Sequence, residues 1–141
     1  MNPETLFTIC NFAALAGWVL LVFLPRWKWT SRIVLSGAAP LALAVVYLVL
    51  AATTLPKAEG GFGSLAEVAK LFRNDWVLLA GWVHYLVFDL FVGSWEVRDS
   101  QRLGVSHWLV IPCLILTFML GPIGFLAYHL VRLKARGKEP V

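Results

Sequence analysis

The sequence predicts an all-α integral membrane protein, a bundle of four transmembrane helices that forms a single domain over residues 1–141. Of these residues, 60% are hydrophobic and only 14% are charged, whereas soluble domains carry roughly 25% charged residues. A short chain has a large surface for its volume. So few charged residues cannot make that whole surface polar, so part of it must contact lipid rather than water. Long apolar runs in the sequence also end in basic and aromatic residues, as membrane spans do at the interface.

Four apolar runs have lengths suited to crossing about 30 Å of hydrocarbon. They cover residues 5–24, 33–55, 76–93 and 108–131. The first run ends at the aromatic and basic cluster 26–29, which is typical of a membrane–water interface. Pro40 lies inside the second run, where we expect it to kink the helix. Pro112 and the pair Gly121-Pro122 lie inside the fourth run, where neighbouring groups must satisfy the freed carbonyls.

Residues 64–74 predict a short amphipathic helix that lies on the membrane surface. Ser64 and Glu67 have the spacing of a capping box. Leu65, Val68 and Phe72 follow at helical spacing and would form one apolar face. A solvated helix within a loop fits the same pattern equally well.

The chain contains an internal echo, because residues 15–19 (LAGWV) recur as residues 79–83. The echo suggests two repeated helical hairpins with the same orientation, related by an axis along the membrane normal. Chance similarity between two apolar segments is the alternative.

Basic residues leave the orientation of the bundle open. Four spans would place the loops after the first and third spans on one side and the C-terminal tail on the other. Both sides are then rich in arginine and lysine, so the positive-inside rule gives conflicting answers. These clusters follow apolar runs directly, so we interpret them as anchors to membrane lipid headgroups and expect no nucleic-acid binding.

Two ionisable residues lie within the third apolar run. His84 is eight residues from its start, or about 12 Å into the membrane. Ionisable groups at the centre of a span cost roughly 2.5–3.5 kcal/mol and usually face the bundle interior at a functional site. A neutral His84 bonded to another helix, and an interfacial Asp89 paired with Arg98 or Arg102, are the structural alternatives.

Further acidic residues extend this pattern beyond the span. Asp89 and Glu96 are seven residues apart and share a helical face if the helix continues. Together with Asp99 and His107 they form a candidate site for a divalent metal or for acid–base chemistry. The spacing is not diagnostic of a metal, and an ion-pair network with the nearby arginines explains it equally well.

Two familiar membrane cofactors are disfavoured. Bis-histidine haem needs two histidines at one depth, but His107 and His129 lie about 33 Å apart along one predicted helix and neither matches His84. A retinal Schiff base needs a lysine, and none lies inside a predicted span.

The third span carries a recognisable pattern. Residues 81–96 read GWVHYLVFDLFVGSWE, followed by LGVSH at 103–107, IPC at 111–113 and LGP at 120–122. In these motifs the chain resembles the membrane protein family named after the plant abscisic-acid-deficient neoxanthin synthase. The resemblance covers most of the chain and is strongest over residues 76–128.

This resemblance implies a role in carotenoid metabolism. The plant member is linked to opening an epoxide of violaxanthin to give the allene of neoxanthin, an isomerisation that needs a general acid and a base in an apolar cleft. The candidate acid–base or catalytic residues are His84, Asp89, Glu96 and Asp99. Aromatic residues would line the cleft against an apolar polyene ligand, although packing and interface anchoring are the commoner roles of such residues: Trp18, Trp82, Tyr85, Phe88 and Trp95.

The absence of a recognisable plastid transit segment predicts a bacterial protein of the inner membrane, acting on a carotenoid, a retinoid or another isoprenoid lipid. Two non-enzymatic functions stay open. One is a carotenoid-binding accessory protein, and the other is a small proton-coupled transporter that uses His84 and Asp89. A homo-oligomer or a partner biosynthetic enzyme is compatible with each of them.

Overall fold

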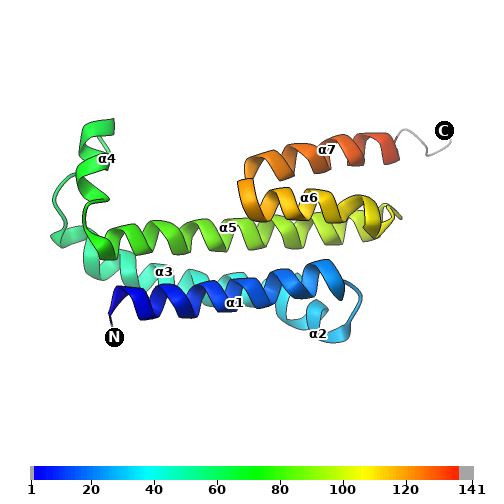
Figure 1. Ribbon diagram of the computed structural model, residues 1–141, viewed down its shortest axis with the longest axis horizontal. Helices are drawn as coiled ribbons and strands as arrows, with labels where there is room; N and C mark the ends of the chain where they lie inside the picture. The colour runs from blue at the N-terminus through cyan, green and yellow to red at the C-terminus, as the bar shows by residue number, and fades with distance from the viewer. Residues whose placement is uncertain (1, 137–141) are drawn as a thin grey trace.

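The computed structural model describes residues 2–136, and every regular element within them is a helix. Three stretches are long and apolar enough to cross a membrane, namely α1, the run Lys28–Lys57 and α5. They lie side by side, and the shorter α6 and α7 pack along the second half of α5 (Figure 1). The elements are α1 Pro3–Phe23, α2 Lys28–Thr30, η1 Ser31–Leu35, α3 Ala38–Thr54, η2 Leu55–Lys57, α4 Leu65–Leu71, α5 Asp75–Arg102, α6 His107–Leu120 and α7 Pro122–Arg136.

The first helix is set by its cap and by close packing on α5. Asn2 caps α1, because its side chain accepts a hydrogen bond of 2.8 Å from the backbone nitrogen of Thr5. Near the middle of the bundle, the ring of Trp18 lies against Gly93 of α5, where a Cβ atom would come within 2.6 Å of it. The buried Trp18 therefore packs the α1–α5 interface.

The second predicted span departs from a regular helix at Gly37 rather than at Pro40. The chain forms a π-helical turn over η1, and Gly37 then adopts a left-handed conformation with φ 88° before α3 begins. Pro40 lies in the first turn of α3, where its missing N–H costs no helical hydrogen bond. The expected kink at Pro40 is corrected to a break three residues earlier, where glycine tolerates positive φ.

The short helix after the second span is confirmed as α4. Ser64 accepts a hydrogen bond of 3.2 Å from the backbone nitrogen of Glu67, as the capping box predicts. The helix ends at Leu71, three residues before the predicted end, and Leu71 is its one buried residue. Its placement on the membrane surface stays a prediction.

The fourth predicted span, residues 108–131, is not one helix. Gly121 ends α6 with φ 44° and ψ −93°, the chain reverses, and α7 returns along α6 (Figure 1). Glycine permits this turn, and Pro122 starts the next helix at a position that suits proline. With 14 residues, α6 is about 21 Å long and falls short of a 30 Å hydrocarbon core. The two predicted hairpin repeats correspond to the pairs α1–α3 and α5–α6, and these pairs differ in the length of their second helix. The internal repeat therefore stays a prediction.

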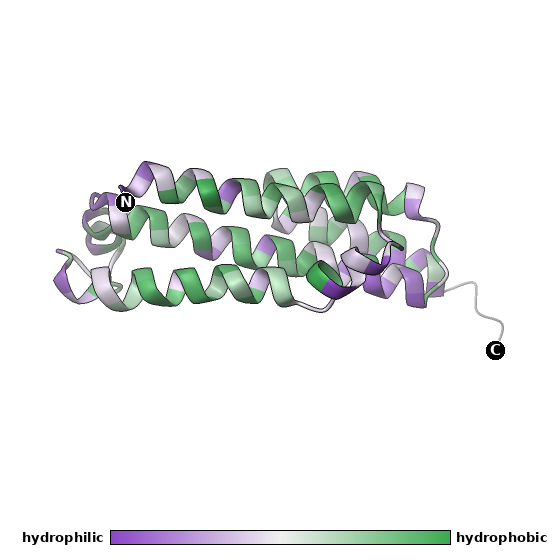
Figure 2. Cartoon of the chain, turned by 90° about the horizontal axis from the view of Figure 1, so that it is seen from below, coloured by the Kyte–Doolittle hydropathy of each residue, from purple (hydrophilic) through white to green (hydrophobic). Residues whose placement is uncertain are grey.

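The hairpin of α6 and α7 brings the basic clusters to one end of the bundle. The α1–α2 connection, the end of α5 and the end of α7 lie together (Figure 1), and hydrophilic residues gather there while the helices are apolar between the ends (Figure 2). The basic residues at this end are Arg26, Lys28, Arg32, Arg98, Arg102, Arg132, Lys134 and Arg136. In this arrangement the two counts of basic residues no longer conflict, and the positive-inside rule predicts that this end faces the cytoplasm.

This arrangement predicts a labelling pattern for single cysteines in a background without Cys10 and Cys113. In membrane vesicles, Lys28→Cys and Lys134→Cys should react with a membrane-impermeant maleimide from the same side. Lys70→Cys, which follows the second span, should react from the opposite side. Labelling of Lys134→Cys together with Lys70→Cys would show that the fourth run crosses the membrane after all.

Candidate functional site

One face of α5 carries four buried or half-buried polar residues, and the α6–α7 hairpin covers this face. Tyr85, Asp89, Glu96 and Asp99 recur at spacings of three, four and seven residues, so they lie along this face. Their polar contacts outside α5 come from the hairpin. The hairpin therefore builds the site.

Glu96 is the most enclosed of these side chains. It is 0% exposed, and so is Thr117 of α6, whose hydroxyl donates a hydrogen bond of 2.8 Å to Glu96 Oε1. The other carboxyl oxygen, Oε2, is buried and has no hydrogen-bond partner within residues 2–136. Buried carboxyl oxygens are normally paired, so an unpaired one indicates a place for a proton, a water molecule or a ligand group.

Asp89 lies midway along α5, beside the turn of the hairpin. Its Oδ1 atom is 3.0 Å from the position that a Cβ atom on Gly121 would occupy. Its Oδ2 atom is buried and, like Glu96 Oε2, lacks a partner in the described part of the chain. One turn earlier, the Tyr85 hydroxyl donates a hydrogen bond of 3.1 Å to the backbone oxygen of Phe118, which ties the end of α6 to α5.

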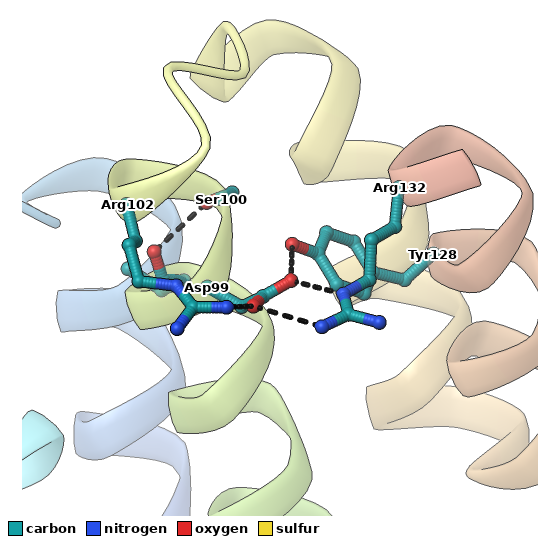
Figure 3. Close-up of polar contacts among 6 residues, drawn as sticks. Asp99, Ser100, Arg102, Tyr128 and Arg132 are labelled. Carbon is teal, nitrogen blue, oxygen red and sulfur yellow. Dashed lines mark hydrogen bonds and ion pairs between the residues drawn. The ribbon is translucent and has the colours of Figure 1, made fainter. Parts of the chain in front are cut away.

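Asp99 has a different environment, because cations and a hydroxyl surround it (Figure 3). Arg132 Nε lies 2.6 Å from Oδ2 and Arg132 Nη2 lies 3.4 Å from Oδ1. Tyr128 donates a hydrogen bond of 3.0 Å to Oδ2, and Arg102 Nη2 lies 3.3 Å from Oδ1. Both oxygens of Asp99 are occupied, so this residue holds α7 against α5.

An aromatic stack continues this contact along α7. The rings of Trp95 and His129 stack with centroids 5.8 Å apart, and the Arg132 guanidinium lies 5.7 Å from the centroid of Trp95. His129 Nδ1 is a third buried polar atom without a partner in the described structure. Sequence reasoning missed the contributions of Thr117, Tyr128 and Arg132, because the packing of α6 on α5 brings Thr117 to Glu96, and only the reversal at Gly121 brings Tyr128 and Arg132 to Asp99.

His84 does not face these carboxylates. Its side chain is exposed on the outside of α5, and its ring lies between Tyr47 and Phe88 at centroid distances of 5.4 Å and 4.8 Å. The expectation that the imidazole faces the carboxylates is corrected, because residue 84 falls on the face of α5 beside α3, where it lines a hollow with Tyr47 and Phe72.

The predicted metal set of Asp89, Glu96, Asp99 and His107 does not assemble. His107 Nε2 lies 2.8 Å from the backbone oxygen of Val22, and Asp99 is paired with Arg132. Within residues 2–136, no group of three or more histidine, cysteine, aspartate or glutamate side chains is placed to hold a metal ion. The helix α5 continues through Asp89, Glu96 and Asp99, but His107 begins α6, and the four side chains have different partners.

The aromatic residues predicted to line one cleft separate in the same way. Trp18 packs on Gly93, and Trp95 packs on α7. Phe88 is 55% exposed beside His84. Only Trp82 and Tyr85 lie together, with ring centroids 5.3 Å apart, on the side of α5 that approaches α1.

Gly124 of α7 lets the hairpin close over Glu96. A Cβ atom at Gly124 would overlap the backbone nitrogen and Oγ1 of Thr117. Gly124→Ala should therefore push α7 away from α6 and lower the free energy of unfolding by about 1–3 kcal/mol, the usual range for overpacking. Thermal unfolding in detergent measures this change. Gly63→Ala is the control, since a Cβ atom there meets open space; equal stability of the two variants would contradict the packing.

Comparison with known proteins gives one family. The model of the ABA4-like family, described as ABA DEFICIENT 4-like, matches residues 5–128. The chain is 25% identical over 139 residues to "Protein ABA DEFICIENT 4, chloroplastic" from Arabidopsis thaliana. That alignment covers 92% of this chain and 61% of the plant protein, so the chain spans less than two thirds of its relative. No solved structure matches the chain.

Proposed function

Because the chain belongs to the ABA DEFICIENT 4-like family, we propose that it is a membrane enzyme that isomerises a carotenoid or another isoprenoid lipid by acid–base chemistry. The observation that carries this proposal is Glu96, fully buried among apolar helices with one oxygen held by Thr117 and the other unpaired. Buried ionisable groups inside a membrane bundle are costly and usually serve a function. Asp89 adds a second unpaired oxygen on the same face of α5.

Two carboxyl groups on one helix face suit an isomerisation that moves a proton. In the epoxide opening that the family resemblance implies, an acid protonates the epoxide oxygen as its C–O bond breaks, which leaves a hydroxyl group. A base then removes a proton from carbon, and the released electron pair forms the new C=C bond of the allene. One proton is given and one is taken, so the reaction needs no outside reductant or oxidant.

The two carboxyl groups have different surroundings, which favours different roles. Thr117 donates to Glu96 and fixes its position, whereas Asp89 lies at the hairpin turn, where α6 ends and α7 begins. We assign the role of base to Glu96, because the hydrogen bond to Oε1 fixes the carboxylate and leaves Oε2 free to accept a proton from the substrate. Asp89 is then the acid, since it is half-buried whereas Glu96 is fully enclosed. We place the protein in a bacterial inner membrane.

The test is conversion of a defined carotenoid by the purified protein. We expect violaxanthin, incubated with protein in lipid nanodiscs, to give a product of unchanged mass with a shifted absorption spectrum and a new retention time. Pigment that stays bound but unchanged would indicate a carotenoid-binding accessory protein instead. Failure to bind or convert violaxanthin, zeaxanthin or an isoprenoid quinone would overturn the proposal.

A further inference from the structure

A hollow of about 300 Å³ lies between α3 and α5, in the half of the bundle that ends in the basic residues. Its walls are apolar and come from both helices, with Leu41 and Ala44 on α3 and Phe88 and Phe91 on α5. Among the lining residues that the structure describes, Arg98 is the only charged one. We name this hollow the α3–α5 groove.

The α3–α5 groove is separate from the carboxyl groups assigned to the acid–base chemistry. Arg98 and Glu96 are two residues apart on α5, and a turn of about 100° per residue places them on nearly opposite sides of the helix. Neither Glu96 nor Asp89 lines the groove. The groove is therefore a second site, and its occupant is independent of the proposed function.

Arg98 has hydrogen-bond donors to spare. Its Nη1 atom donates a hydrogen bond of 2.6 Å to the backbone oxygen of Leu35, which holds the side chain beside η1. A guanidinium carries five N–H donors, and no carboxylate within residues 2–136 forms an ion pair with this one. The neighbouring acid, Asp99, is already paired with two other arginines. Arg98 can therefore bind an anion from outside the chain.

The groove has the depth of one membrane leaflet. Phe88 and Arg98 are ten residues apart on α5, which corresponds to about 15 Å at 1.5 Å per residue. A hydrocarbon core of about 30 Å has leaflets of about 15 Å, and Phe88 lies near the middle of α5. When Phe88 and Phe91 lie among acyl chains, Arg98 therefore reaches the level of the lipid headgroups.

A second arginine lies close to this level. Ser36 lines the groove, and its hydroxyl donates a hydrogen bond of 2.6 Å to the backbone oxygen of Arg32, one turn earlier. The Arg32 guanidinium lies 5.7 Å from the ring centroid of Trp29, and no carboxylate in the described part of the chain pairs with it. The headgroup end of the groove is therefore electropositive.

We propose that the α3–α5 groove binds one anionic phospholipid, whose phosphate pairs with Arg98 and whose acyl chain lies against Phe88 and Phe91. A planar guanidinium holds two phosphate oxygens at once, and an acyl chain in the hollow covers its apolar walls. A zwitterionic lipid fits less well, because its ammonium group would lie near Arg32 and Arg98. The positive-inside rule predicts that this end faces the cytoplasmic leaflet, whose anionic lipids attract basic residues.

Native mass spectrometry of the full-length protein in a neutral detergent counts bound lipids one by one. With dioleoyl phosphatidylglycerol we expect a single tight adduct on the wild-type protein. Arg98→Gln should weaken it about tenfold or more, the usual effect of losing a hydrogen bond to a charged group. Arg26→Gln is the matched control, because Arg26 is exposed at the same end and does not line the groove. It removes the same charge and should bind as the wild type does.

A second pair of variants leaves Arg98 and its hydrogen bond to Leu35 in place. Ala44→Phe fills the groove from α3 and should weaken phosphatidylglycerol binding to a similar extent. Ala42→Phe adds the same ring at an exposed position of α3 outside the groove, and should leave binding unchanged. Thermal unfolding in detergent shows whether each variant folds, and the alanine pair decides if Arg98→Gln does not.

Three outcomes would overturn the inference. Equal losses in Arg98→Gln and Arg26→Gln, with unchanged binding by Ala44→Phe, would show diffuse attraction to the basic end rather than a site. Phosphatidylcholine retained as tightly as phosphatidylglycerol would show that the groove does not select an anionic lipid. Displacement of phosphatidylglycerol by an equal concentration of glycerol phosphate would show that Arg98 binds a free phosphate group without an acyl chain in the groove.

Discussion

Glu96→Gln is expected to lower the rate of carotenoid conversion about 10²- to 10⁴-fold, the contribution that a positioned acid or base usually makes. Glutamine keeps the shape of the side chain and can still accept the hydrogen bond from Thr117, whose donor lies 2.8 Å away. It cannot take up a proton from the substrate. Binding of violaxanthin should stay within a factor of two of the wild type, because the substitution keeps the size and shape of the side chain. Rates and bound pigment are measured on the same nanodisc preparations.

Glu67→Gln is the matched control for this experiment. Glu67 lies on α4 and is exposed, so the same chemical change there should leave conversion at the wild-type rate. Asp89→Asn should also reduce conversion, because it removes the proposed acid. A Glu96→Gln protein that converts pigment at the wild-type rate would remove the buried carboxyl group from the mechanism.

Asp99→Ala is expected to lower the free energy of unfolding by about 2–3 kcal/mol, because the ion pair with Arg132 is partly buried and its loss lies between that of an exposed pair and that of a fully buried one. The Asp99 side chain is 5% exposed and that of Arg132 is 19% exposed, so water replaces the lost contacts poorly. Tyr128 would also lose the acceptor of its hydrogen bond. Because these contacts join α5 to α7, the hairpin should loosen first. Thermal unfolding in detergent, together with proteolysis near α7, measures the effect.

Arg102→Ala provides the comparison within the same network. Its side chain is 69% exposed and contacts Asp99 at 3.3 Å from within α5, so its loss should cost less than about 1 kcal/mol. Equal destabilisation by Asp99→Ala and Arg102→Ala would mean that the bond between α5 and α7 is not what stabilises the hairpin.

The sequence by itself determined the all-helical, apolar character of the chain and three helical stretches long enough to cross a membrane. The lengths of the apolar runs predict α1, the stretch Lys28–Lys57 that contains α3, and α5. A membrane span needs about 20 apolar residues whatever surrounds it. The spacing of Ser64 and Glu67 predicted the start of α4, since a cap is a local interaction. The motifs at 81–96 and 103–122 likewise indicated the family that residues 5–128 match.

Only the tertiary structure decided the course of the chain after Gly121 and the face that each polar residue presents. A hairpin of two apolar helices and a single long apolar helix have the same hydropathy, so composition cannot distinguish them. The packing of α6 on α5 brings Thr117 to Glu96, 21 positions away, and the reversal at Gly121 brings Arg132 to Asp99, 33 positions away. His84 and Asp89 differ by five residues, and their helical angles direct one toward Tyr47 of α3 and the other to the hairpin turn. Packing between distant segments selects among such alternatives, because only burial against a partner makes one of them lower in free energy.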